Sequence, residues 1–166
     1  MRKFEIISKR QFDSDFNGYN IEYNDIMLPK RNTKYSAGYD FYIPFDIVIK
    51  SNQIVKIPTG IKVLLNNDEF LGMYIRSSLG FKYNLRMCNQ VGIIDSDYYN
   101  NINNEGHIFV KIKNEGQEDV ILKKNDRYVQ GIIQKYYIVD DEDNEYYDKR
   151  IGGFGSTNKG ENNNER

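Results

Sequence analysis

The 166-residue chain has no tryptophan, one cysteine, one histidine and almost no net charge. Cys88 on its own excludes an intramolecular disulfide, and with only His107 beside it a zinc site is not expected. A formal net charge of −1 provides no strong field to steer the protein onto nucleic acid or an anionic membrane. The first residues contain no sustained apolar run, so we expect no signal peptide, no membrane span and a cytoplasmic protein.

Short β-type runs separated by turn residues make up most of the chain. Val and Ile are enriched in residues 45–50, 53–57, 60–65, 120–122 and 129–137. Ile108, Val110 and Ile112 alternate with more polar neighbours, which is the period-2 pattern of a strand with one buried face. This pattern predicts an all-β sandwich or barrel. One helix is expected, over residues 77–85, with Ser77 or Ser78 as its N-cap.

The polar composition of the C-terminal part predicts three regions. Residues 1–139 form the β domain, residues 140–148 an acidic linker, and residues 149–166 a glycine-rich lid with a disordered tail. In the lid, glycines on both sides of Phe154 let the backbone approach a ligand closely, and the ring offers a face to a flat base. A disordered tail without function is the alternative interpretation.

Four further segments are compatible with the same nucleotide chemistry as the lid. These are residues 37–42 (AGYDFY), 76–80 (RSSLG), 92–98 (GIIDSDY) and 126–130 (DRYVQ). With residues 153–157 (GFGST) they resemble, in order and spacing, the five motifs of the trimeric dUTPases, from about Leu28 to Thr157. The resemblance implies a jelly-roll-like β-barrel, assembled as a homotrimer whose C-terminal lids are exchanged between subunits, in a bacterial or phage member of the family.

The implied reaction is hydrolysis of dUTP to dUMP and pyrophosphate, which limits uracil incorporation into DNA and supplies dUMP for dTMP synthesis. The family's catalytic aspartate falls on Asp95, which would orient a water molecule and take its proton. From the residues alone, a turn aspartate is an alternative for Asp95, because Asp-Ser-Asp is good turn chemistry.

The hairpin that leads to Asp95 is expected to read the base and the sugar. Asn89 and the backbone around Ile93 and Ile94 would match the hydrogen-bonding edge of uracil, and Tyr98 would lie against the deoxyribose so that a 2′-hydroxyl clashes. An ordinary loop residue for Asn89 and a core aromatic for Tyr98 are the alternatives.

The phosphates are expected to meet a second set of residues. Arg76, Ser77 and Ser78 would bind phosphate oxygens, and Gln130 a phosphate or a structural water, while Arg127 is either a ligand or structural. Mg²⁺ is the expected cofactor and would arrive with the triphosphate, with Asp40 as an outer-shell carboxylate acting through water.

The lid would complete the substrate site. Phe154, Gly155, Ser156 and Thr157 are assigned to it, together with either Lys149 or Arg150, because the sequence departs from the family pattern here. Strict spacing favours Lys149 for the γ-phosphate, whereas residue type favours Arg150.

Residues 99–105 form an Asn-rich insertion after Tyr98 that we expect to be loose. The insertion would tune the site or bind a regulatory protein partner. Two alternative functions are a dCTP deaminase-like enzyme of the same superfold and a nucleotide-gated regulatory binding protein. A structural β-sandwich protein is the third alternative.

Overall fold

The computed structural model describes residues 1–142 of the chain. Its strands are β1 (Lys3–Ile6), β2 (Tyr39–Tyr42), β3 (Ile47–Ile49), β4 (Ile54–Pro58), β5 (Ile61–Leu64), β6 (Glu69–Ile75), β7 (Leu85–Met87), β8 (Gly92–Asp95), β9 (Phe109–Asn114), β10 (Val120–Leu122) and β11 (Arg127–Lys135). The helices are α1 (Lys9–Asp15), α2 (Ser77–Tyr83) and the 3₁₀ turns η1 (Tyr23–Asp25) and η2 (Ser96–Tyr98).

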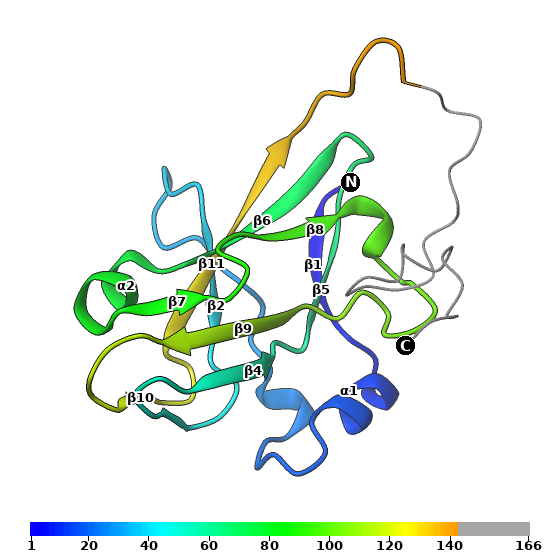
Figure 1. Cartoon of the computed structure of the whole chain (residues 1–166). Coiled ribbons are helices and arrows are strands. Elements are labelled where there is room, and N and C mark those ends of the chain that lie inside the picture. Colours follow the sequence, from blue (N-terminus) through cyan, green and yellow to red (C-terminus); the bar gives the residue numbers. More distant parts are fainter. Residues whose placement is uncertain (143–166) are drawn as a thin grey trace, which may run out of the picture.

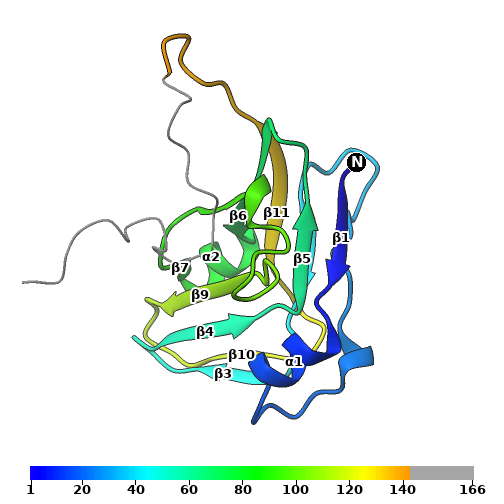
Figure 2. The same cartoon turned by 90° about the vertical axis from the view of Figure 1, so that its right-hand side faces the viewer.

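All strand pairs are antiparallel. A four-stranded sheet has the order β2-β11-β6-β8 and a three-stranded sheet the order β4-β9-β7, while β1 pairs with β5 and β10 with β3. In Figure 2 the strands β1, β5 and β11 run across the direction of β3, β4, β9 and β10. The mostly-β fold predicted from the sequence is confirmed.

The core follows from the alternation of side chains along the strands. On β9, Val110 and Ile112 are fully buried whereas Lys111 between them is exposed. Buried residues from several strands, among them Phe41, Ile57 and Leu71, belong to one hydrophobic cluster. The cluster fixes the relative positions of the strands, and their ends carry the polar residues of the candidate site.

The helices differ from the prediction at two points. α2 covers most of the predicted range, but its N-cap is Arg76, and Ser77 and Ser78 are the first two helical residues. The sequence pattern also missed α1, a helix of seven residues. Ser8 caps α1 by accepting a hydrogen bond from the amide of Gln11, and a Ser three residues before a Gln is a readable capping signal. Within residues 1–142, no helix is long and apolar enough to cross a membrane.

The expectation of a loose insertion at residues 99–105 was wrong. The side chain of Asn101 is 7% exposed, and its Oδ1 accepts from the amides of Asn103 and Asn104. Its Nδ2 donates to the carbonyl of Tyr98 at 2.8 Å. An asparagine that satisfies its neighbours' backbone groups in this way makes an Asn-rich stretch into a defined turn.

Candidate functional site

The phosphate end of the candidate site is a network of two arginines around one buried carboxylate. Asp40 on β2 is 7% exposed; its Oδ1 lies 3.1 Å from Arg76 Nε and its Oδ2 lies 3.2 Å from Arg127 Nη1. Arg76 Nη1 also donates to the carbonyl of Arg127 at 3.3 Å. Asp40 therefore orients both guanidinium groups while leaving most of their donors available to an anion.

Strand pairing brings the three segments of this end together. Gln130 on β11 lies opposite Asp40 on one side and Tyr74 of β6 on the other. A Cβ added to Gly38 would come within 2.4 Å of Gln130 Oε1, so the backbone before β2 packs directly onto this amide. From the sequence, Arg127 could be either a phosphate ligand or a structural residue. In the structure its guanidinium group pairs with Asp40, whereas the carboxylate of its neighbour Asp126 accepts from the amide of Lys123.

The helix α2 adds hydroxyl groups beside this network. Ser77 and Ser78 are exposed at its first turn, directly after Arg76. A shallow cavity of about 350 Å³ lies against this turn and is lined by Ile75, Ser77, Gly80, Phe81 and Asn84. Two serine hydroxyls next to an arginine provide uncharged and charged donors of the kind that phosphate oxygens accept.

The second group of predicted residues lies on the β7–β8 segment, which is the loop after β7 together with β8, and on its continuation. The hairpin expected here was wrong, because β7 pairs with β9 and β8 pairs with β6. Asn89 is exposed in the turn, where Gln90 has a φ of 58° and the amide of Val91 donates to the carbonyl of Asn89. Along β8, Ile93 is 53% exposed and Ile94 packs against the core. The β7–β8 segment thus exposes Asn89 in its turn and leads into Asp95, the last residue of β8.

Asp95 and Tyr98 are joined by the single 3₁₀ turn η2. Asp95 is the residue that precedes this turn and Tyr98 is its last residue. Asp95 is partly exposed, whereas Tyr98 is 6% exposed and its hydroxyl donates to the carbonyl of His107 at 3.0 Å. The partly exposed carboxylate of Asp95 therefore lies at the start of a turn whose last residue, Tyr98, is buried and hydrogen-bonded.

The two groups lie at opposite ends of β6. Asp95 pairs with Phe70 near the start of β6, and Arg76 follows the last residue of the strand. Six residue-to-residue steps of extended strand lead from Phe70 to Arg76, a span of about 20 Å. Figure 1 shows the same separation, with α2 and η2 on opposite sides of the molecule. One copy of the chain therefore does not bring Asp95 to the arginines.

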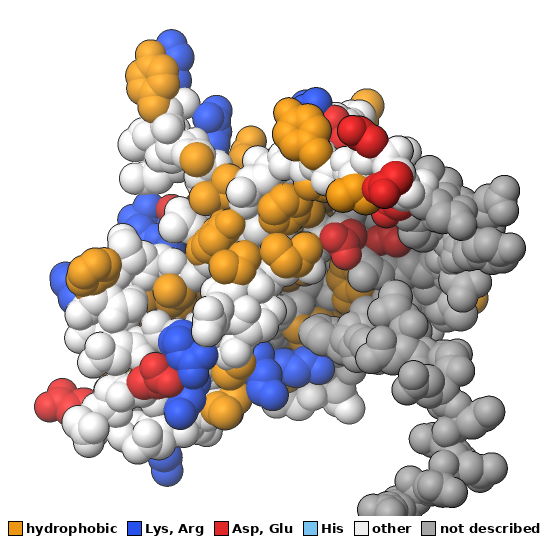
Figure 3. All heavy atoms as spheres, turned by 45° about the horizontal axis from the view of Figure 1, so that its top comes forward, with side chains coloured by type: hydrophobic (Ala, Val, Ile, Leu, Met, Phe, Trp, Pro, Cys, Tyr) orange, Lys and Arg blue, Asp and Glu red, His pale blue; other side chains and the backbone are white. Residues whose placement is uncertain are grey.

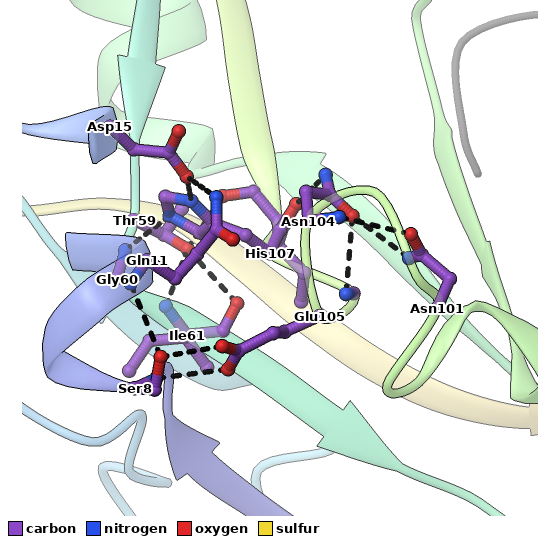
Figure 4. Close-up of polar contacts among 12 residues, drawn as sticks. Ser8, Gln11, Asp15, Thr59, Gly60, Ile61, Asn101, Asn104, Glu105 and His107 are labelled. Carbon is purple, nitrogen blue, oxygen red and sulfur yellow. Dashed lines mark hydrogen bonds and ion pairs between the residues drawn. The ribbon is translucent and has the colours of Figure 1, made fainter.

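Two residues beyond the Tyr98 end of η2, His107 and Asp15, were not singled out as site residues from the sequence. The ring of His107 is fully buried; its Nε2 accepts from the amide of Gly60 at 2.8 Å, so its Nδ1 carries the proton and donates to Asp15 Oδ2 at 2.6 Å. Figure 4 shows Asp15, on α1, pointing at this ring. Burial lowers the pKa of His107 below its ordinary value although Asp15 favours the charged form. Contacts between residues so far apart in sequence leave no local signal.

The predicted lid residues Lys149, Arg150, Phe154, Gly155, Ser156 and Thr157 lie outside the described residues. Among residues 1–142, no group of three His, Cys, Asp or Glu side chains is arranged to hold a metal ion. Each oxygen of Asp40 is ion-paired with one guanidinium group, so its position fits the orientation of arginines better than direct metal ligation.

Comparison with known proteins gives a consistent result. The family model described as dUTPase matches residues 24–158. A deoxyuridine 5′-triphosphate nucleotidohydrolase of Lactococcus lactis is 43% identical over 132 residues, which is 80% of this chain and 88% of that protein. The crystal structure of a dUTPase from Streptococcus mutans has a TM-score of 0.68 and 38% identity, covering 82% of this chain and 98% of that one.

A more distant structure shares the fold alone. The dUTPase of phage phi11 of S. aureus, described with a structural Mg(II) ion, is 16% identical with a TM-score of 0.64, covering 89% of this chain and 98% of that one.

Proposed function

Because the chain belongs to the dUTPase family, we propose that it hydrolyses dUTP to dUMP and pyrophosphate. The observation that carries this proposal is that a partly exposed Asp95 at the end of β8 occurs together with a separate set of oriented phosphate donors around Arg76. The proposed location of this enzyme is the cytoplasm.

The chemical step requires one base and several donors. Asp95 accepts a proton from a water molecule as the water oxygen bonds to the α-phosphorus, and the bond from that phosphorus to the bridging oxygen breaks. Arg76 and the hydroxyls of Ser77 and Ser78 bind the phosphate oxygens and stabilise the pyrophosphate that leaves. Gln130 holds a phosphate or a water beside them.

The β7–β8 segment and its continuation supply selectivity for the base and the sugar. The exposed turn at Asn89 and the backbone of Ile93 and Ile94 pair with the uracil edge, which presents an acceptor, a donor and an acceptor. Cytosine inverts part of this pattern and leaves buried groups unpaired. Tyr98 lies against the deoxyribose and excludes a 2′-hydroxyl.

Mg²⁺ fits this site as an ion brought in by the substrate. The described residues form no carboxylate cage, so the phosphates and waters would be its ligands, as this hard ion prefers. When bound, it neutralises charge on the triphosphate. The outer-shell role of Asp40 stays a prediction, and the contacts of this carboxylate support its role in orienting Arg76 and Arg127.

The separation along β6 supports a site shared between subunits. A base must lie within hydrogen-bond reach of its water, and about 20 Å between the two ends of β6 is too far for that. Apolar side chains are exposed on the β7–β8 segment and beyond β11: Val91, Ile93, Tyr137, Ile138 and Val139. Figure 3 shows hydrophobic side chains gathered on this face of the molecule. Burying them in a homotrimer would bring the β7–β8 segment of one subunit to the arginines of the next.

A panel of nucleoside triphosphates, assayed for pyrophosphate release with magnesium, tests the function. We expect rapid turnover of dUTP, with dCTP, dTTP and UTP as poor substrates. Release of ammonia from dCTP would instead identify a deaminase, and nucleotide binding without turnover would identify a regulatory binding protein.

Mixing two inactive variants tests the shared site. Asp95→Asn and Arg76→Ala are prepared separately and co-refolded in equal amounts. If one subunit supplies Asp95 and its neighbour supplies Arg76, random mixing in a ring restores about a quarter of the wild-type activity. No recovery, or a monomer by sedimentation, would contradict the shared site. The C-terminal lid, with Phe154 over the base and Lys149 or Arg150 on the γ-phosphate, is proposed to close over such a site.

A further inference from the structure

One side chain of the insertion, that of Asn104, hydrogen-bonds directly to Tyr98, the last residue of η2. Asn104 Nδ2 donates to the hydroxyl of Tyr98 at 2.7 Å, and this hydroxyl in turn donates to the carbonyl of His107. Asn104 Oδ1 accepts from Asn101 Nδ2 at 2.8 Å and from the amide of Gly106 at 3.2 Å. The phenol of Tyr98 is therefore held between a donor and an acceptor, both downstream of it in sequence.

The orientation of the Asn104 amide follows from its neighbours. The backbone N–H of Gly106 can only donate, so the atom that faces it must be the oxygen of Asn104. The nitrogen then faces Tyr98, whose hydroxyl uses its own proton for the carbonyl of His107. Each polar atom of this set has a matching partner, and such satisfied networks hold side chains in one geometry.

The insertion is itself fixed to the N-terminal segment. The amide of Ser8 donates to Glu105 Oε2 at 3.0 Å and its hydroxyl donates to Glu105 Oε1, while Lys62 lies 3.4 Å from the same carboxylate. Figure 4 shows Ser8 facing Glu105, while Asp15 points at His107 from α1. Ser8 and Asp15 precede residue 24, where the match to the family model begins. The N-terminal segment thus supports the insertion from outside the matched region.

We infer that Asn104 is a positioning residue for the Asp95 end of the site. By holding Tyr98 at one end of η2, it fixes the turn that carries Asp95 at the other end, and it sets the angle at which the Tyr98 ring meets the sugar. This inference rests on the proposed function, because it takes Asp95 as the base and Tyr98 as the residue that reads the sugar. A small displacement of a reacting group is enough to slow the chemical step.

The variant Asn104→Asp tests this role with almost no change in shape. The carboxylate still accepts from Asn101 and Gly106, but it cannot donate to the Tyr98 hydroxyl. We expect kcat for dUTP to fall about tenfold while KM changes much less, and the preference for dUTP over UTP to fall by a similar factor. In a Tyr98→Phe background, the same substitution should have little further effect, because the hydroxyl that it disturbs is gone.

Two matched controls separate positioning from general stability. Asn114 holds a turn in the same manner: its Oδ1 accepts from the amide of Gly116, and its Nδ2 donates to the carbonyls of Ile49 and Glu118. Asn114→Asp should therefore lower the melting temperature without changing kcat or the sugar preference. Asn103→Asp places the same new charge on the exposed part of the insertion. It should leave kcat and the preference for dUTP over UTP unchanged.

The outcomes are distinguishable. If the wild type turns over dUTP and Asn104→Asp keeps wild-type kcat and sugar preference, the role of Asn104 is overturned and the proposed function stands. If the effect of Asn104→Asp is equally large in the Tyr98→Phe background, it does not act through the hydroxyl, and the inference is again wrong. If the wild type does not hydrolyse dUTP, the proposed function fails and the role of Asn104 fails with it.

Discussion

The two ends of β6 carry polar residues of different kinds. At the phosphate end, charged groups are held by ion pairs, and the side chains of Arg76 and Arg127 remain 27% and 35% exposed. At the Asp95 end, Tyr98, the last residue of η2, is held by neutral groups: the amide of Asn104 and the carbonyl of His107, whose own imidazole is 0% exposed. Asp95 is the one carboxylate at this end that takes part in the proposed reaction, as the base.

The difference reflects what each end is proposed to bind. An anion with several charges is best met by guanidinium groups that stay partly hydrated and are oriented by a single carboxylate. A base and a sugar carry no charge and are selected by shape and hydrogen-bond pattern, which requires rigid neutral groups. Substitutions at the two ends should therefore change different measured quantities.

The largest effect is expected from Asp95→Asn. The amide keeps the size of the side chain but cannot take a proton from water, so kcat should fall by about 100-fold or more. Binding of a non-hydrolysable dUTP analogue, measured by calorimetry, should stay near that of the wild type. Near-normal turnover would remove Asp95 from the chemical step.

A smaller effect, on binding, is expected from Asp40→Asn at the opposite end. Loss of the carboxylate leaves Arg76 and Arg127 without their common partner, so the affinity for the dUTP analogue should fall about tenfold while kcat falls less. Asp46→Asn is the matched control, because Asp46 pairs with Lys123 on the surface. If both variants bind alike, Asp40 does not orient the arginines.

The imidazole at the Asp95 end should make stability depend on pH. Burial lowers the pKa of His107 below its ordinary value of 6.5; Asp15 and Glu105 raise it and Lys56 lowers it, without reversing the direction. His107 therefore takes up a proton more readily in the unfolded chain than in the folded one. The free energy of unfolding that this residue contributes above pH 6.5 is lost as the pH falls through the pKa of His107 in the folded protein.

Thermal unfolding at pH 7.5 and at pH 5.5 measures this loss, which should be on the order of a few degrees in Tm. His107→Gln, which can still accept from Gly60 and donate to Asp15, should reduce it. Glu69 does not interfere, because hydrogen bonding to Arg2 lowers the pKa of Glu69 to about 2 and its contribution is lost only under much stronger acid. An unchanged pH dependence in the variant would assign the effect to other groups.

The smallest effect contrasts two tyrosines. Among the described residues, the Tyr128 hydroxyl is a fully buried side-chain group without a hydrogen-bond partner, and burial raises its pKa. Tyr128→Phe should therefore stabilise the protein by about 1 kcal/mol, whereas Tyr98→Phe should destabilise it by about as much, because the Tyr98 hydroxyl has two partners. Denaturant unfolding measures both. A loss of stability in Tyr128→Phe would show that its hydroxyl is satisfied in solution.

Most of the strands could be read from the sequence because side-chain alternation is local. Val110, Lys111 and Ile112 already identify the buried and exposed faces of β9. α1 was missed because a helix of seven residues shows little periodicity, although Ser8 and Gln11 carry a capping signal. The insertion was predicted to be loose from its composition, and the bonds made by Asn101 depend on geometry that composition does not contain.

The sequence by itself determined the residue types of the proposed site and their order, because motifs such as Arg76-Ser77-Ser78 carry their chemistry in adjacent positions. Only the tertiary structure decided that Asp95 and Arg76 lie at opposite ends of β6, that Asp40 joins two arginines, and that Asn104 holds Tyr98. Strand register and loop closure join residues far apart in the chain. They are set by which faces can be buried together, and no short window of sequence records that choice.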